Sequence, residues 1–163
     1  MQLTLLRGAD DLSVFIGLSA AEAMTYENDR RCFSRLIFRV DRSGARAEVW
    51  NGSVWVGPKR TNNEAEYSGL IEGLKAAKKL GIKKLAVEGD SKLVIQQMLG
   101  NYKVSSPKMI PLFKQAKLIS RTFDQLKMEH IERARNGRAD TLANTAMDTR
   151  LSSSFTHPNF STR

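Results

Sequence analysis

The clearest hydrophobic pattern in the chain follows a polar stretch at residues 61–64 and continues to Gly81. Its apolar residues recur at the spacing of one helix face: Leu70, Ile71, Leu74, Ala77 and Leu80. Thr61 or one of the two asparagines after it can cap the first turn, and Glu64 is placed for a capping box. Gly81 supplies a C-terminal stop, so the pattern predicts a single amphipathic helix.

One acidic residue, Glu66, falls on the apolar face of this predicted helix, one turn before Leu70. A buried carboxylate is costly unless it is paired or binds a metal ion. The spacing alone leaves two interpretations open. Glu66 is either an edge residue stabilised by the helix dipole or a member of a functional site.

The residues before this helix read as short strands. Residues 35–40, 45–50 and 53–57 are rich in apolar and β-branched side chains, and Asn51-Gly52 is a tight-turn signal. We therefore expect a three-stranded meander to lead into the helix. The start of the chain is less regular, and its predicted elements are short strands at residues 3–6 and 13–18 and a helix at 20–24.

After Gly81 the chain predicts a strand at residues 83–90 with Asp90 at its carboxyl end, followed by a short helix at 91–99. Strands that alternate with helices after a meander indicate a mixed α/β sheet. Ligands of open sheets bind beyond the carboxyl ends of strands, so Asp90 would lie at such a site. Alternatively, Asp90 caps the following helix.

A longer helix is predicted at residues 107–123, and one of its faces carries Lys114, Lys117 and Arg121. Such a face is either solvated surface or a contact for a phosphate backbone. A strand at 125–131 follows, and then a last helix at 138–147 with Asp140 in its first turn.

The composition indicates one class of binding partner and argues against a membrane or secreted protein. The chain has 163 residues, the size of one domain, and 26 Lys and Arg against 17 Asp and Glu, a net charge of +9 that favours a polyanionic partner. The sequence shows neither a membrane-spanning run nor a signal peptide, and a single cysteine, Cys32, fits a reducing compartment. We expect an intracellular protein, nuclear or cytoplasmic, that is a monomer with no membrane partner. Residues 149–163 lack acidic residues and a periodic pattern, which predicts a disordered basic tail.

Three segments resemble ribonuclease H of the type 1 class, in the order and with the spacing of that family: residues 61–67 (TNNEAEY), 87–91 (VEGDS) and 135–144 (RNGRADTLAN). The resemblance covers about residues 34–148. It implies an α/β fold with an RNase H-like mixed sheet, an antiparallel meander followed by parallel strands, flanked by helices. Residues 1–33 would then be a divergent N-terminal segment.

The resemblance also implies a chemistry. The metal-binding carboxylates of the family fall on Glu66, Asp90 and Asp140, which would hold two Mg²⁺ or Mn²⁺ ions and hydrolyse the RNA strand of an RNA–DNA hybrid. Two hard cations activate a water and stabilise the leaving oxygen. Asn62 and Asn63 match the positions that contact the minor groove, where the 2′-hydroxyl of RNA is exposed.

One family feature is not identified in this chain. The family begins with a strand close to Phe-Asp-Gly-x-Ser, whose aspartate bridges both metals. Residues 14–19 (VFIGLS) place Ile16 at that aspartate, and residues 6–10 place Arg7 there unless Asp10 or Asp11 substitutes. We therefore expect hybrid binding with weak or absent cleavage. Two alternatives stay open: a catalytically inactive nucleic-acid-binding domain, and a domain derived from a retroelement polyprotein.

Overall fold

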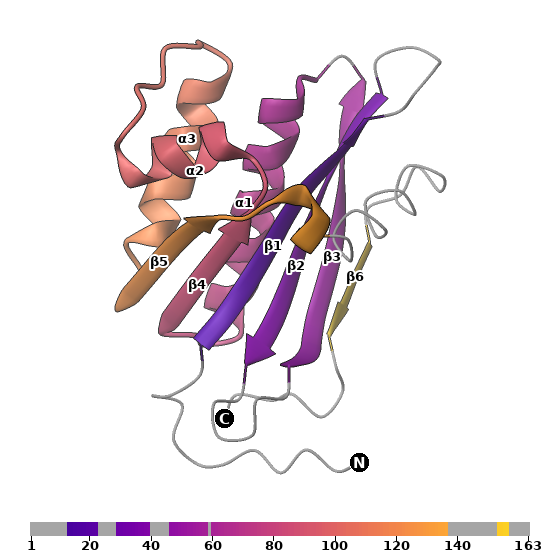
Figure 1. The fold of residues 1–163 in the computed structure, drawn as a ribbon, viewed down its shortest axis with the longest axis vertical. Helices are drawn as coiled ribbons and strands as arrows, with labels where there is room; N and C mark the ends of the chain where they lie inside the picture. The colour runs from indigo at the N-terminus through magenta and orange to yellow at the C-terminus, as the bar shows by residue number, and fades with distance from the viewer. Residues whose placement is uncertain (1–12, 23–28, 40–45, 59, 137–152, 157–163) are drawn as a thin grey trace.

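A computed structural model of the chain describes residues 13–22, 29–39, 46–58, 60–136 and 153–156. In these residues, six strands form one sheet in the order β5-β4-β1-β2-β3-β6 (Figure 1). The strands are β1 (Ser13–Glu22), β2 (Asp29–Arg39), β3 (Arg46–Pro58), β4 (Lys84–Gly89), β5 (Gln125–His130) and β6 (Ser153–Thr156). The pairs β1–β4 and β4–β5 are parallel and the other pairs are antiparallel, which confirms the predicted mixed sheet.

β1 lies at the centre of the sheet, between β4 and β2. The strand predicted at residues 13–18 is confirmed and continues to Glu22. The helix predicted at 20–24 is wrong for its first three residues, which pair with β2 instead. Pairing with a neighbouring strand satisfies the backbone and overrides a weak local preference for helix. The strand predicted at 3–6 lies outside the described residues.

The tight turn predicted at Asn51-Gly52 is also wrong, because both residues lie inside β3, a continuous strand of 13 residues. Asn51 pairs with Arg35 of β2, and Gly52 pairs with Ser34. Both also face β6 on the other side. A turn at this point would break ladders with two strands, so the longer strand is favoured. The meander before the helix therefore consists of β1, β2 and β3.

Part of the predicted disordered tail is ordered in the structure. Residues Ser153–Thr156 form β6 and pair antiparallel with residues 50–53 of β3. The segment has no hydrophobic period, and its pairing depends on the backbone of β3. The sequence pattern therefore did not predict this strand. The rest of the tail lies outside the described residues.

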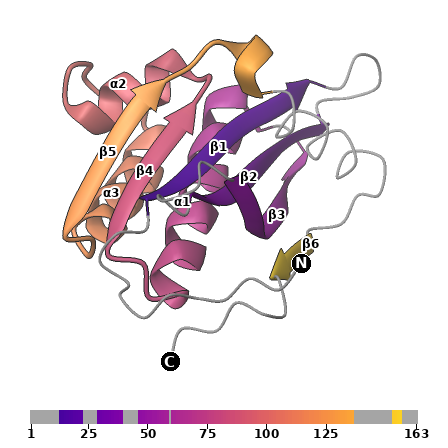
Figure 2. The ribbon, with the colours of Figure 1, turned by 60° about the horizontal axis from the view of Figure 1, so that its bottom comes forward.

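In the part of the chain that the structure describes, three helices pack on the same side of the sheet (Figure 2). They are α1 (Asn62–Lys79), α2 (Lys92–Leu99) and α3 (Met109–Ser120), and a short 3-10 helix, η2 (Arg133–Asn136), follows β5. The core between helices and sheet contains the largest fully buried side chains, which are Tyr67, Leu70, Leu74, Ile95, Val87 and Val94. Among the described residues, no helix has the length and apolarity needed to cross a membrane.

The predicted capping box at the start of α1 is confirmed. The backbone N–H of Glu64 donates to Oγ1 of Thr61 at 3.2 Å, and the backbone N–H of Thr61 donates to Oε2 of Glu64 at 2.8 Å. Arg60 donates to the other oxygen of Glu64 at 3.0 Å. Burial acts to raise the pKa of Glu64, but the hydrogen bonds from Thr61 and Arg60 outweigh it, and the pKa is lowered.

The capping box predicts a loss of stability in the variant Thr61→Ala. We expect its free energy of unfolding at neutral pH to fall by about 1 kcal/mol, because the α1 amides lose their side-chain acceptor. Glu64 has a lowered pKa, so its contribution is present above its ordinary value of 4.5 and is lost as the pH falls through the lowered pKa. The deficit of the variant should therefore shrink in acid.

Urea unfolding of both proteins at neutral and acidic pH measures this difference. Ser105→Ala, at an exposed loop position, is the control and should unfold like the wild type. A Thr61→Ala protein as stable as the wild type at neutral pH would contradict the role given to the cap.

Candidate active site

The site that Asp90 predicts lies at one end of the sheet. β1, β4 and β5 are parallel, so their carboxyl ends meet at the same edge, and α1 and α2 begin at this end (Figure 1). The pairing extends past the strands, since the N–H of Ile131 donates to the carbonyl of Gly89 at 2.9 Å. Open α/β sheets bind ligands at such an edge.

Glu66 lies in the second turn of α1 and is 6% exposed. It is flanked by Ala65 and Tyr67, which are fully buried. The prediction that this carboxylate lies on the core-facing side of the helix is therefore confirmed. Glu66 is therefore more buried than expected for a residue at the edge of the apolar face.

Asp90 comes directly after the last residue of β4 and is half-buried. It does not cap α2. The cap is Ser91, whose Oγ accepts a hydrogen bond from the N–H of Val94. The capping interpretation of Asp90 is therefore wrong, and the position of this carboxylate at the edge of the sheet needs another explanation.

The two carboxylates fit a hard divalent cation. Within the described part of the chain, Oε2 of Glu66 and Oδ1 of Asp90 are buried and accept no hydrogen bond, although both residues have other interactions. Buried carboxylate oxygens are the donors that Mg²⁺ and Mn²⁺ prefer. Asp140, the third predicted ligand, lies outside the described residues. Among the described residues there is no group of three or more His, Cys, Asp or Glu side chains that could hold a metal. The three-carboxylate site thus stays a prediction.

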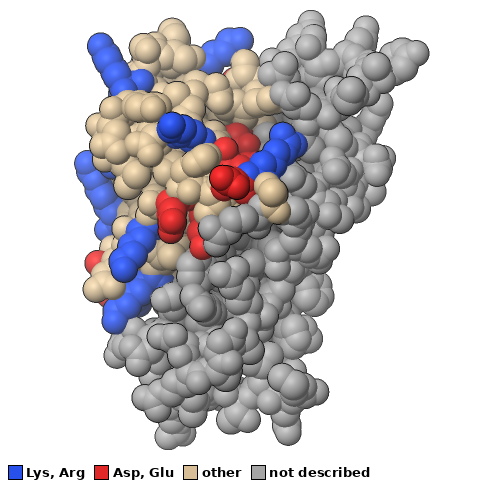
Figure 3. All heavy atoms as spheres, in the orientation of Figure 1, with Lys and Arg blue, Asp and Glu red and all other residues tan. Residues whose placement is uncertain are grey.

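Acidic side chains also gather on the face of the sheet turned away from the helices, over the C-terminal halves of β4 and β5 (Figure 3). Glu88 and Glu129 are direct neighbours in the register of these strands, and Glu132 follows β5. Basic side chains lie on either side of this group in Figure 3. Acidic and basic side chains thus alternate on this face of the sheet, beside the strand end that Asp90 follows.

The register of β1 corrects the position assigned to the family's first aspartate. Ile16 is level with Val87, and Leu18 is level with Gly89. One further step along both strands brings Ser19 level with Asp90. Ile16, which the family resemblance matches to the first aspartate, is therefore level with Val87 inside the sheet and not with the end of β4. The one acidic residue of β1 is Glu22, which lies further along the strand. The alternative at residues 6–10 lies outside the described residues.

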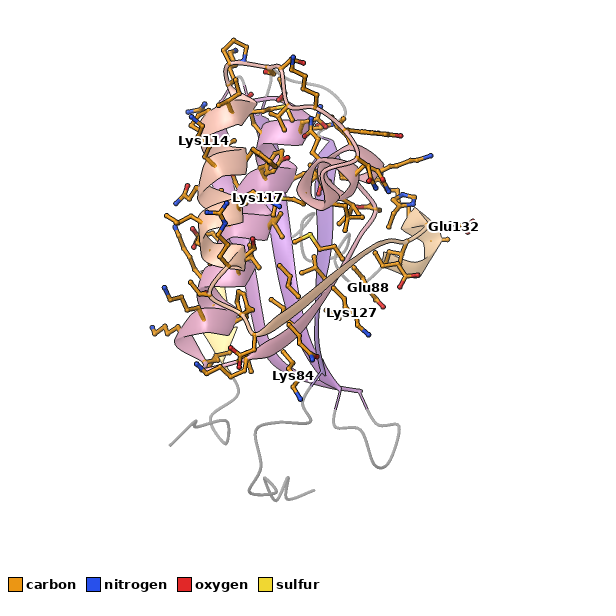
Figure 4. All side chains as sticks on the ribbon, turned by 90° about the vertical axis from the view of Figure 1, so that its left-hand side faces the viewer. Lys84, Glu88, Lys114, Lys117, Lys127 and Glu132 are labelled. Carbon is orange, nitrogen blue, oxygen red and sulfur yellow. The ribbon has the colours of Figure 1, made fainter. Side chains whose placement is uncertain are left out.

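The predicted nucleic-acid contacts lie in two places. Asn62 and Asn63 are the first residues of α1, are half-buried, and lie at the end of the molecule that carries Asp90. The predicted basic face lies on α3. Lys114 and Lys117 lie on the helix side of the sheet, whereas Glu88 and Lys127 lie on its other side (Figure 4).

The three basic residues of the predicted face, Lys114 and Lys117 in α3 and Arg121 at its C-cap, are not equivalent. Lys114 and Arg121 are exposed, but Lys117 is half-buried and its Nζ donates to the carbonyl of Met98 at 3.1 Å. This bond satisfies a carbonyl in the last turn of α2 and ties α3 to α2. Lys117 therefore has a structural role that the charge pattern alone did not indicate.

Sequence reasoning missed one buried polar contact near the site. The hydroxyl of Tyr67 donates to Oε1 of Gln97 at 2.8 Å, and the two residues are 0% and 4% exposed. Burial raises the pKa of Tyr67, so its hydroxyl remains a donor at neutral pH. In the sequence, this contact was indicated by a polar residue, Gln97, at a position of α2 that packs against the core.

The sheet is mixed, helices cover one of its sides, and carboxylates lie after β4 and on the buried face of α1. Together these features define an RNase H-like domain. The chain belongs to the reverse transcriptase-like family, whose sequence model matches residues 27–146. This match begins before residue 34, the predicted domain boundary, and includes all of β2.

Several known proteins are similar to this chain. The bifunctional protein Rv2228c of Mycobacterium tuberculosis is 50% identical over 90 residues, which are 55% of this chain and 25% of that protein. Ribonuclease HI of Halobacterium salinarum is 38% identical over 106 residues, which are 65% of this chain and 53% of that protein. The chain thus spans a quarter to a half of the length of these relatives.

Solved structures show the same similarity. The N-terminal RNase H domain of Rv2228c superposes with a TM-score of 0.70 at 36% identity, covering 85% of this chain and 96% of that chain. LC11-RNase H1 in complex with an RNA/DNA hybrid superposes with a TM-score of 0.66 at 27% identity, covering 84% of this chain and 98% of that chain.

The contact of Lys117 predicts that the basic residues of α3 differ in their effect on stability. Lys117→Ala removes a half-buried hydrogen bond, so we expect the free energy of unfolding to fall by about 1 kcal/mol. Lys114→Ala changes an exposed side chain and should stay within about 0.5 kcal/mol of the wild type. Urea unfolding of the two variants checks the difference. Equal stabilities would show that the bond to Met98 contributes nothing.

Proposed function

We propose that this chain is a ribonuclease H-type domain that binds RNA–DNA hybrids and cleaves their RNA strand slowly, with divalent metal ions. The observation that carries the proposal is the register of the central strand. By resemblance Glu66 and Asp90 match two family carboxylates, and one step past the last pair of the register, Leu18 with Gly89, the residue of β1 level with Asp90 is Ser19. The domain thus keeps its binding elements and lacks one negative charge at its reacting centre.

Three kinds of similarity support hybrid recognition. The family match covers most of the chain, Ribonuclease HI is a relative, and one of the similar structures is a complex with an RNA/DNA hybrid. The net charge of +9 is suited to a nucleic acid. Asn62 and Asn63, at the start of α1, provide amide groups that can donate to and accept from a 2′-hydroxyl.

In this proposal Glu66, Asp90 and Asp140 would hold Mg²⁺ or Mn²⁺ ions, which would supply Lewis-acid activation of a water and of the phosphodiester. Glu66 contributes a carboxylate that the packing of α1 holds in place. Asp90 contributes a carboxylate at the edge of the sheet, fixed by the end of β4 and by the cap of α2. Ser19 has no charge to offer, so this protein compensates the charge of the phosphate less than a site with an aspartate there.

The chain as written should therefore bind a labelled hybrid and cleave it slowly, and Ser19→Asp should raise the cleavage rate at least about tenfold. Ile16→Asp, level with Val87, is the matched control and should have no such effect. Rates are measured with Mg²⁺ and with Mn²⁺, and duplex DNA and duplex RNA serve as negative substrates. Glu66→Gln should abolish cleavage in the Ser19→Asp background.

Fast cleavage by the wild type would contradict the proposed deficit. Asp10→Asn and Asp11→Asn would then test whether one of these residues supplies the missing carboxylate. If both the wild type and Ser19→Asp bind hybrid without cleaving it, the protein is a non-catalytic hybrid-binding domain. The absence of an aspartate from β1 favours this second candidate.

Hybrid binding should weaken steeply as salt rises, because phosphate contacts release counterions. The double variant Lys114→Ala/Arg121→Ala removes two exposed cations of α3 and should reduce the slope of log affinity against log salt by roughly 2. Its preference for hybrid over duplex DNA should not change, since phosphate contacts carry no sequence or sugar information.

The matched control is Lys84→Ala/Lys127→Ala, which removes the same charge from the opposite side of the sheet (Figure 4). Binding is measured by fluorescence anisotropy from low to physiological salt. If both double variants reduce the slope equally, the effect reflects net charge alone and α3 is not a binding face.

A further inference from the structure

A short chain of hydrogen bonds crosses the core beside the candidate site. It starts at the hydroxyl of Tyr67 on α1, which donates to Oε1 of Gln97 on α2 at 2.8 Å. Nε2 of the same glutamine donates to the carbonyl of Lys103 at 3.2 Å, in the loop after α2. Tyr67 and Gln97 are both buried within the apolar core.

The residues at the two ends of the first bond are close in sequence to the two described carboxylates. Tyr67 directly follows Glu66 on α1. Gln97 lies on α2, the helix that Ser91 caps directly after Asp90. The bond therefore joins α1, which carries Glu66, to α2, which begins two residues after Asp90.

Such a bond is directional, whereas the apolar contacts around it are not. A buried amide or hydroxyl without a partner is costly, so the packing of α1 on α2 is favoured only where the hydroxyl of Tyr67 meets the amide of Gln97. The leucine and valine side chains of the same core would tolerate small shifts between the helices. Divalent cations bind best when their oxygen ligands are held at fixed separations.

We infer that Tyr67 and Gln97 are positioning residues, which fix the separation of Glu66 and Asp90 by tying α1 to α2. This inference rests on the proposed metal-dependent function. Both residues are buried in the core, so in this inference neither is a ligand of the metal or a contact of the hybrid. They act through the backbone of their helices, and the bond from Gln97 to Lys103 holds the glutamine amide in the orientation that Tyr67 needs.

The consequence is measurable in metal affinity. Tyr67→Phe removes the hydroxyl and leaves the ring and the bond from Gln97 to Lys103 in place. Gln97→Met has a similar volume and removes both bonds. Each variant should bind Mn²⁺ roughly 2- to 10-fold more weakly than the wild type, the factor that one hydrogen bond contributes to an equilibrium. The double variant should be no weaker than Gln97→Met, because both changes break the same link.

The test is calorimetric titration of the full chain with Mn²⁺ alone, without nucleic acid and without turnover. Glu66→Gln identifies the site, since it should abolish the Mn²⁺ binding of the wild type. Ile82→Val is the matched control for stability. It removes one methylene from a buried residue before β4, at the end of that strand away from Asp90. Thermal unfolding verifies that every variant is folded and ranks their stabilities.

The outcomes separate the inference from the proposed function. Weaker Mn²⁺ binding by Tyr67→Phe and Gln97→Met, with wild-type affinity in Ile82→Val, supports the positioning role. Wild-type affinity in Tyr67→Phe overturns it, even if the variant is less stable, and leaves the proposed function standing. A wild type whose Mn²⁺ binding is absent or unaffected by Glu66→Gln overturns both the metal site and the inference.

Discussion

The burial of one face of α1 is the interaction on which the rest of the structure depends. Leu70 and Leu74 are fully buried there, and each such side chain contributes about 1.5–3 kcal/mol relative to remaining in water. Glu66 lies on the same face and is carried into the interior by this packing. The apolar side chains thereby supply the free energy that holds a carboxylate where it is poorly solvated, which is the condition for a tight cation site.

The parallel strands add the second constraint. β1, β4 and β5 all end at the edge where α1 and α2 begin, so a carboxylate after β4 and one on α1 reach the same end of the molecule without any direct sequence relation. The central strand, β1, reaches the same end of the sheet. Its parallel pairing with β4 ends at Leu18 and Gly89, so Ser19 is the next residue of β1 at the end where Asp90 follows β4.

The contacts of the helices indicate how the site is held together. α1 begins at a capping box, α2 begins at Ser91, and the two helices meet through Tyr67 and Gln97. α3 is tied to the end of α2 through Lys117, which links a residue predicted to bind nucleic acid to the stability of the helical layer. A basic side chain can thus serve packing and binding together, and stability measurements separate the two.

The sequence by itself determined α1, β4, α2 and their ends, because helical spacing, capping residues and glycine stops are local signals. It also identified Glu66 and Asp90 as candidate site residues, because a carboxylate on an apolar helix face and one at the end of a strand are visible in the sequence. Tertiary structure decided the rest. The continuity of β3 through Asn51-Gly52, the strand at Ser153–Thr156 and the register of β1 depend on backbone pairing between distant segments. Local propensity carries no information about such pairing, so the sequence alone could not show that Ile16 is level with Val87. The bond between Tyr67 and Gln97 was hidden for the same reason: each residue fits its own helix, and only the packing of α1 on α2 brings them together.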